Sequence, residues 1–213
     1  MADKVSSAYN QWSATYDQVA NKTRDLSAKV LRSQSLPLNG ATVIEMGCGT
    51  GLNTAYLAVL AGHVTALDFS EGMMAQAKTK VASDRVIFKQ CDITQGWPVS
   101  DQTADVVVGN LVLEHIADLS PVFAHAFRAL KPGGQMFVCE LHSAKQMLGK
   151  KAVFTDTATG QDVDFPAYFH DVSDYANAAL SVGFQIVQMN EWRDDDSNKM
   201  EPPRLITFRF VKP

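Results

Sequence analysis

The sequence has few cysteines and no long apolar run, and both absences exclude classes of protein. Its three cysteines, Cys48, Cys91 and Cys139, are odd in number and show no CxxC spacing, which favours reduced thiols in the cytoplasm. Apolar runs stay far below the ~20 residues of a membrane-spanning helix. The N-terminal residues include an acid and lack the apolar core of a signal peptide. We therefore expect a cytoplasmic protein that does not insert into membranes.

An excess of positive charge is also absent. Lysine and arginine number 19 against 23 aspartate and glutamate residues, which gives a formal net charge of −4. This balance argues against binding nucleic acid through bulk positive charge. The acidic run 194–196 is typical of a solvated loop, so we expect no metal site.

The chain has 213 residues, of which 46% are hydrophobic, and we predict a single domain over residues 1–213.

Short apolar runs alternate with amphipathic segments along most of the chain. The runs predict strands at 41–46, 64–67, 86–89, 104–109, 135–141, 184–189 and 205–211. The other segments predict helices over 50–61, 119–130 and 172–182, and a further helix capped by Ser70. Such alternation is typical of βαβ units, and the last two strands follow each other with no helix between them. We predict an α/β fold with a Rossmann-like, doubly wound sheet of seven strands, mostly parallel, with an antiparallel C-terminal hairpin.

Two segments lie outside this alternation. Residues 1–36 have an amphipathic helical pattern that ends before Pro37, and Trp12 and Tyr16 are spaced to share one helical face. This segment is either a helix packed on the core or a lid whose aromatic face closes over a ligand. Residues 143–171 are too long for an ordinary connection, so we interpret them as a cap inserted near the ligand cleft.

A glycine-rich loop follows the first predicted strand. Glycines at alternate positions, Gly47, Gly49 and Gly51, allow backbone amides to approach a ligand where a Cβ would collide. The position three after Gly49 is Leu52, so the dinucleotide fingerprint GxGxxG fails, and the lysine of a phosphate-binding P-loop is missing. Asp68 ends the next strand, where its two carboxylate oxygens are placed to accept both hydroxyls of a ribose.

Glu45 stands just before this loop. Its carboxylate would repel a diphosphate but suits a cationic ligand. The stretch Glu45–Gly51 resembles the cofactor motif of the class I S-adenosylmethionine-dependent methyltransferases. Further segments resemble that family in the same order, namely Asp68, Cys91–Ile93, Asn110–His115 and Ala129–Gly134. The similarity covers about residues 38–142 well and the final hairpin by pattern only. It is greatest to the branch that includes ubiquinone, menaquinone and biotin-pathway methyltransferases.

The resemblance implies that S-adenosylmethionine is the cofactor and assigns parts of its site. It implies that Glu45 lies near the methionine end, Asp68 holds the ribose and Asp92 lies near the adenine amino group. One of Met73 and Met74 would contact the adenine while the other packs in the core. The residues expected at the cofactor are Tyr16, Glu45, Gly47, Gly49, Gly51, Asp68, Phe69, Met73, Asp92, Ile93, Asn110 and Leu111.

Methyl transfer from a sulfonium needs a base only when the nucleophile must lose a proton. Histidine is the default base because its unperturbed pKa of ~6.5 suits neutral pH. His115 and His142 follow the fourth and fifth predicted strands at the ligand end, and His170 lies on the side of the insert. We treat these three histidines as the candidate catalytic residues.

The aromatic segment, the insert and the lack of an appended RNA-binding module favour a small-molecule acceptor. We predict methyl transfer to an O, N or C atom of such an acceptor, and nucleic acid is not expected as a partner. Two alternatives stay open: a methyltransferase acting on RNA or protein, and a protein that binds S-adenosylmethionine without transferring its methyl group.

Overall fold

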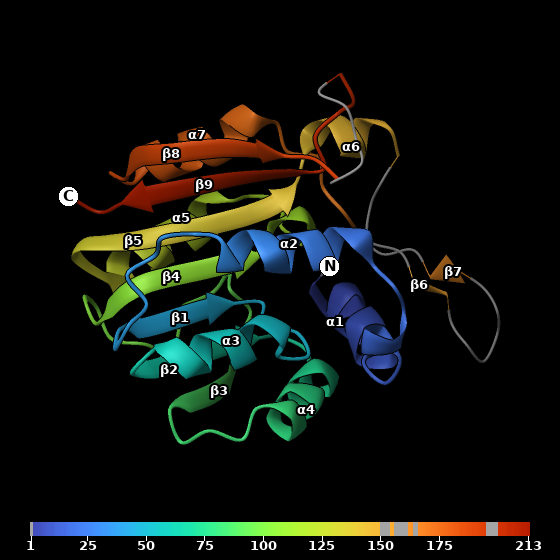
Figure 1. Ribbon diagram of the computed structural model, residues 1–213, viewed down its shortest axis with the longest axis horizontal. Coiled ribbons are helices and arrows are strands. Elements are labelled where there is room, and N and C mark those ends of the chain that lie inside the picture. The colour runs from blue at the N-terminus through green and yellow to red at the C-terminus, as the bar shows by residue number, and fades with distance from the viewer. Residues whose placement is uncertain (1, 150–153, 156–161, 164–165, 195–199) are drawn as a thin grey trace.

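The computed structural model describes residues 2–149, 154–155, 162–163, 166–194 and 200–213. A sheet of seven strands runs through it in the order β3-β2-β1-β4-β5-β9-β8 (Figure 1). Paired strands among β1 to β5 are parallel, and β9 runs antiparallel to both β5 and β8. The strands are β1 (Thr42–Met46), β2 (His63–Asp68), β3 (Val86–Gln90), β4 (Ala104–Asn110), β5 (Leu130–Leu141), β8 (Gln185–Trp192) and β9 (Leu205–Val211). This confirms the predicted Rossmann-like sheet and its antiparallel C-terminal hairpin.

Helices cover both faces of the sheet. In Figure 1, α2 (Lys22–Arg32) and α3 (Leu52–Leu60) lie over one face, with α5 (Ser120–Ala129) and α7 (Val172–Ser181) on the other. The remaining elements are α1 (Ala2–Trp12), η1 (Tyr16–Gln18), α4 (Glu71–Lys80), η2 (Leu113–His115), α6 (Ser143–Met147), β6 (Phe154–Thr155) and β7 (Asp162–Val163). Three of these, α1, α6 and the β6–β7 pair, gather beyond the carboxyl ends of the parallel strands (Figure 1).

The side chains of β1 show how strand alternation builds a core on each face. Val43 packs with Leu31 and Leu57 under α2 and α3, whereas Ile44 packs on the opposite face with Phe123 of α5. All five side chains are at most 2% exposed. Burying each contributes roughly 1.5–3 kcal/mol. A strand that is apolar on both faces therefore fixes the sheet as the middle layer of a three-layer fold.

The N-terminal segment is helical, as predicted, but it is broken into α1, η1 and α2. Trp12 ends α1 and Tyr16 begins η1, so the expected continuous helical face does not form. Their rings nevertheless meet edge to face with centroids 4.6 Å apart. The side chain of Asn21 accepts hydrogen bonds from the amides of Thr23 and Arg24, and this N-cap starts α2 in a new direction.

The start of β5 also differs from the prediction. It begins at Leu130 instead of residue 135, because Leu130 already pairs with Ala104 before the register shifts. Gly133 takes a left-handed φ of 78°, which keeps the chain turning within the strand. Its amide donates to the carbonyl of Lys212 at 2.7 Å, so the irregular start is tied to the end of the chain.

The expected cap is described only in part. Its beginning forms α6, and residues 166–170 return to η2, where the amide of Tyr168 donates to the carbonyl of Glu114 at 2.7 Å. Of the acidic run, only Asp194 is described, and it forms a two-pronged ion pair with Arg204. No group of three metal-ligating side chains occurs in the described ranges. The helices described there are too short or too polar to cross a membrane.

Candidate functional site

Two adjoining cavities lie at the carboxyl ends of the parallel strands. Their volumes are about 90 Å³ and 400 Å³. They share the walls formed by Gly47, Asp68, Phe69, Val112 and His115. The smaller cavity is further lined by Tyr9, Tyr16, Arg24, Ser27, Cys48, Gly49, Thr50, Leu52, Asn53, Met73, Asn110 and Leu111. A shared wall makes them two ends of one elongated site.

The glycine loop forms one wall and is shaped by left-handed backbone. Gly47 has φ 65°, and a Cβ on it would lie 2.5 Å from Cγ2 of Val112. Gly49 has φ 52°, but a Cβ there would meet no atom within 4 Å. Gly47 is therefore required by packing, whereas Gly49 keeps open space on the cavity side.

Asp68 lies at the junction of the two cavities. Its Oδ2 accepts a hydrogen bond from the amide of Gly49 at 2.8 Å, and its Oδ1 accepts one from the amide of Ser70 at 2.9 Å. The side chain is 5% exposed. Burial raises the pKa of Asp68 to about 6, although these two amides oppose the shift. Above that pH the site holds a fixed carboxylate that faces the glycine loop.

The end of β4 adds polar atoms to the smaller cavity. The Nδ2 of Asn110 donates to the hydroxyl of Ser27 at 2.7 Å. Its Oδ1, like Oδ1 of Asn53, is buried and has no hydrogen-bond partner among the described residues. Leu111 takes a left-handed φ of 54°, which is strained for a residue with a side chain. Two unpartnered acceptors beside a strained turn are typical of a site that completes its hydrogen bonds with a ligand.

The larger cavity receives residues from the ends of β2 and β3. Asp92 and Ile93 line it, as does Phe69. The Oδ1 of Asp92 accepts from the amide and hydroxyl of Thr94 at 2.9 and 2.7 Å, which orients the carboxylate within its turn. Pro121 and Tyr168 complete a mainly apolar wall.

Two residues expected at the cofactor do not line either cavity. Glu45 is 3% exposed and its Oε2 accepts from the hydroxyl of Thr54 at 2.6 Å, beneath α3. Burial raises the pKa of Glu45 to about 8, with the charge of Asp68 contributing in the same direction. A Cβ on Gly51 would lie 3.1 Å from Cα of Ala77, so this glycine permits close packing of α3 on α4.

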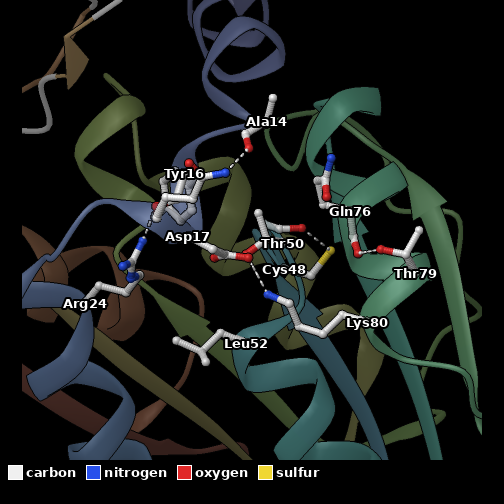
Figure 2. Close-up of polar contacts among 12 residues, drawn as sticks. Ala14, Tyr16, Asp17, Arg24, Cys48, Thr50, Leu52, Gln76, Thr79 and Lys80 are labelled. Atoms are coloured by element: carbon white, nitrogen blue, oxygen red, sulfur yellow. Dashed lines mark hydrogen bonds and ion pairs between the residues drawn. The ribbon is translucent and has the colours of Figure 1, made fainter. Parts of the chain in front are cut away.

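The N-terminal segment is fastened to the glycine loop by a polar cluster (Figure 2). The Oδ1 of Asp17 accepts from the hydroxyl of Thr50 at 2.8 Å, and its Oδ2 pairs with Nζ of Lys80 at 2.6 Å. Arg24 donates to the carbonyl of Tyr16 at 2.7 Å and lies over the Tyr16 ring. These contacts hold Tyr16 and Arg24 against the smaller cavity.

The three candidate histidines are not brought together. His115 lines both cavities. His142 is absent from both walls, because its Nδ1 accepts from the amide of Ala144 as the N-cap of α6. His170 is buried with its Nε2 2.8 Å from the carbonyl of Ile116, outside the two cavities. The geometry therefore leaves His115 as the histidine positioned at the site.

Residues 44–138 match the family described as a methyltransferase domain. A demethylmenaquinone methyltransferase of Clavibacter sepedonicus is 34% identical over 142 residues, which cover 66% of this chain and 56% of that protein. Residues 44–138 thus carry a methyltransferase domain. An uncharacterized methyltransferase of Emericella nidulans is 29% identical, over 86% of this methyltransferase and 76% of that one.

Solved structures share the fold of this methyltransferase. An S-adenosylmethionine-dependent methyltransferase of Listeria monocytogenes superposes with a TM-score of 0.73 at 24% identity, over 88% of this chain and 98% of that one. DhpI in complex with S-adenosylhomocysteine gives 0.76 at 22% identity, over 99% and 97%. The chain spans about half the length of the demethylmenaquinone enzyme, so the acceptor has to be argued from the site itself.

The described residues of this methyltransferase fit S-adenosylmethionine. The open space at Gly49 and the buried carboxylate of Asp68 form a cradle for a ribose. The unpartnered Oδ1 atoms of Asn53 and Asn110 suit an ammonium group, and the guanidinium of Arg24 suits a carboxylate. The methionine part of the cofactor carries both groups, so the polar atoms of the smaller cavity match its chemistry.

Sequence reasoning missed several residues of this methyltransferase that line the smaller cavity. Tyr9, Arg24, Ser27 and Asn53 were not singled out. A signal existed for Arg24 and Ser27, which are three residues apart and therefore share one face of α2. Asn53 follows the glycine loop closely enough to be expected at a ligand of that loop. Tyr9 precedes Tyr16 by two helical turns, but the break after Trp12 removes that regularity.

Proposed function

We propose that this chain transfers a methyl group from S-adenosylmethionine to a small-molecule acceptor in the elongated site. The observation that carries the proposal is the buried Asp68 carboxylate, which accepts a hydrogen bond from the amide of Gly49. The space beside Gly49 is open, because a Cβ there would meet no atom within 4 Å. A carboxylate in this position accepts two hydroxyl hydrogen bonds. The fold and the family of the chain agree with that use of the site.

The chain's residues divide the binding of the cofactor between the two cavities. Asp68 would accept from the ribose hydroxyls, and the walls near Asp92 and Ile93 would take the adenine. Asn110 and Arg24 would hold the charged groups of the methionine part. When bound, the cofactor supplies a methyl group on a positively charged sulfur, which is an excellent leaving group.

With that chemistry supplied, the protein has to align the acceptor and exclude water. Residues 1–36 act in this proposal as a lid, because Tyr16 and Arg24 wall the smaller cavity and Asp17 fastens the segment to Thr50. The described residues at the end of the segment 143–171 act as part of a cap, since Pro166 and Tyr168 line the larger cavity. Walls on both sides favour an acceptor that enters a cavity over an RNA or a folded protein.

Relatives of the chain include enzymes named for demethylmenaquinone and for malonyl-[acyl-carrier protein], so the acceptor chemistry varies among them.

We place the protein in the cytoplasm, which agrees with three buried cysteines that form no disulfide.

A methyl-transfer assay tests this proposal. The protein is incubated with methyl-labelled S-adenosylmethionine and a panel containing phenols, aliphatic alcohols, amines and thiols, and label is counted in the extracted products. We expect label on at least one acceptor with the wild type and its loss with Asp68→Ala. The exposed Asp101 provides a matched control, because Asp101→Ala should transfer label normally. Label on added tRNA or protein alone would replace the small-molecule proposal by its alternative.

A further inference from the structure

Tyr9 of α1 and His115 of η2 meet at the wall of the smaller cavity. The Tyr9 hydroxyl lies 2.8 Å from Nε2 of His115, although 106 residues separate the two in sequence. The Nδ1 of His115 lies 3.0 Å from the carbonyl of Pro166. A carbonyl only accepts, so Nδ1 carries the proton and the Nε2 of the neutral ring is left to accept from Tyr9. The backbone at Pro166 thus fixes which ring nitrogen is basic.

Burial keeps both partners neutral at rest. It lowers the pKa of His115, so the ring is uncharged and able to take a proton at neutral pH. It raises the pKa of Tyr9, so the phenol retains its proton. The ionisable groups that face the pair from neighbouring elements are Tyr16, Asp68, Glu114 and Glu140.

An imidazolium at His115 would be stabilised where it forms. The Oε1 of Glu114 lies 4.0 Å from Nε2 of His115, and both side chains are less than 10% exposed. Opposite charges at such a separation attract more strongly in a buried site than in water. A Glu114 carboxylate at this distance would therefore offset part of the cost that burial places on a charged His115 ring.

We propose that Tyr9 and His115 form the pair that accepts the proton of a hydroxyl acceptor during methyl transfer. This rests on the methyl transfer proposed above. As the acceptor oxygen bonds to the methyl carbon, the methyl–sulfur bond breaks and leaves its electron pair on sulfur. The hydroxyl proton passes to the Tyr9 oxygen while the Tyr9 proton passes to Nε2 of His115. The products are a methyl ether, a neutral thioether and an imidazolium, which later releases its proton to water.

A hydroxyl nucleophile is the class that this pair fits. A neutral amine attacks with its lone pair and needs no base before the bond forms, whereas a hydroxyl oxygen becomes a strong nucleophile only as it loses its proton. Tyr9 is the catalytic residue in this scheme because its oxygen contacts the acceptor. Pro166, through its carbonyl, is a positioning residue for His115.

Side-chain ¹⁵N NMR of histidine-labelled protein tests the first half of the scheme. We expect the His115 ring to show a protonated Nδ1 and a hydrogen-bonded Nε2 near neutral pH. Tyr9→Phe keeps the aromatic ring and should shift only the Nε2 signal, because it removes the donor. A proton on Nε2 in the wild type would overturn the proposal, since that nitrogen would then have no lone pair to receive another.

A coloured phenol, 4-nitrophenol, tests the second half and needs no natural acceptor. Its absorbance is titrated against pH with protein saturated with S-adenosylhomocysteine. We expect the wild type to lower the apparent pKa of the phenol by about one unit, because the pair takes its proton. Tyr9→Phe and His115→Gln should each restore the free value. Tyr56→Phe, a matched change on α3 outside both cavities, should keep the shift.

Either an unshifted phenol with the wild type or an equal shift with Tyr9→Phe would overturn the assignment of the pair. Calorimetry with S-adenosylmethionine separates this failure from failure of the proposed function. If the wild type binds the cofactor but leaves the phenol unshifted, only the pair is wrong. If the wild type does not bind the cofactor, the proposed methyl transfer fails first.

Discussion

Replacing Glu45 by glutamine should make the stability of the protein less dependent on pH between 7 and 8. Glu45 lies beneath α3, is 3% exposed and accepts from the hydroxyl of Thr54 at 2.6 Å. Burial raises its pKa to about 8 in the folded protein, against ~4.3 in an unfolded chain. At the lower end of this range the folded state therefore holds a proton that the unfolded chain has already released.

The sign and size of the effect follow from proton linkage. Because the folded state binds the extra proton, the free energy of unfolding falls as the pH rises toward the folded pKa. The slope is about 1.4 kcal/mol per pH unit for one fully bound proton, and half-titration at pH 8 reduces the loss between pH 7 and 8 to about 1 kcal/mol. Glu140 is equally buried and its pKa is also raised to about 8. The wild type should therefore lose about 2 kcal/mol over this range.

Urea denaturation at pH 7 and pH 8 measures this loss directly. Glu45→Gln keeps an acceptor for Thr54 but no longer titrates, so its loss should be about 1 kcal/mol, half that of the wild type. The exposed Glu71 offers a control, because Glu71→Gln should behave as the wild type does. Equal losses in the wild type and in Glu45→Gln would refute the account of Glu45 as a buried, protonated acid.

Three further predictions concern the glycine loop and the end of the chain. Gly47→Ala should destabilise the protein by roughly 2–4 kcal/mol in urea, because it combines left-handed strain with a clash against Val112. Gly49→Ala should lower the free energy of unfolding by only about 1 kcal/mol. It should also weaken S-adenosylmethionine binding at least about tenfold in calorimetry, because the added Cβ would occupy open space at the wall of the smaller cavity. A Gly49→Ala protein that is less stable than the Gly47→Ala protein would contradict the packing described. Lys212→Met should lower the free energy of unfolding by about 2–3 kcal/mol in thermal denaturation, because Nζ donates to the buried carbonyls of Phe127 and Leu130 at 2.7 and 2.8 Å. An unchanged melting temperature would show that these two hydrogen bonds do not stabilise the protein.

The sheet could be predicted from the sequence because its signals are local. Apolar runs such as 104–109 and glycines such as Gly62 and Gly183 mark strands and helix ends within a few residues of each other. Ser70 was predicted as an N-cap, and its hydroxyl oxygen accepts from the amide of Met73 at 3.1 Å. Met73 lines the smaller cavity and Met74 packs with Cys48, while the contact of either methionine with adenine stays a prediction.

The direction of Glu45 could have been predicted but was missed. Side chains alternate along β1, so Glu45 shares a face with Val43, which packs under α2 and α3. Ile44 and Met46 share the opposite face. This alternation turns Glu45 toward Thr54 of α3, and its side chain lines neither cavity. The role of Glu45 near the methionine end of the cofactor, which the resemblance implies, stays a prediction.

The histidines could not be assigned from sequence because their partners are remote. His142 lies 3.3 Å from the carboxylate of Glu191, which is 49 residues away. His115 owes its place to Tyr9 and to Pro166, which lie on opposite sides of it in the chain. Only the fold brings these groups together, and no local spacing reports them.

Titration of the protein with S-adenosylmethionine in a calorimeter tests the central claim most directly. The account predicts binding of one cofactor per chain to the wild type at micromolar concentrations. It further predicts that Asp68→Ala, which removes two charge-assisted hydrogen bonds, weakens that binding at least about tenfold. Folded wild-type protein that shows no heat of binding, or Asp68→Ala protein that binds as tightly as the wild type, would contradict the assignment of the site.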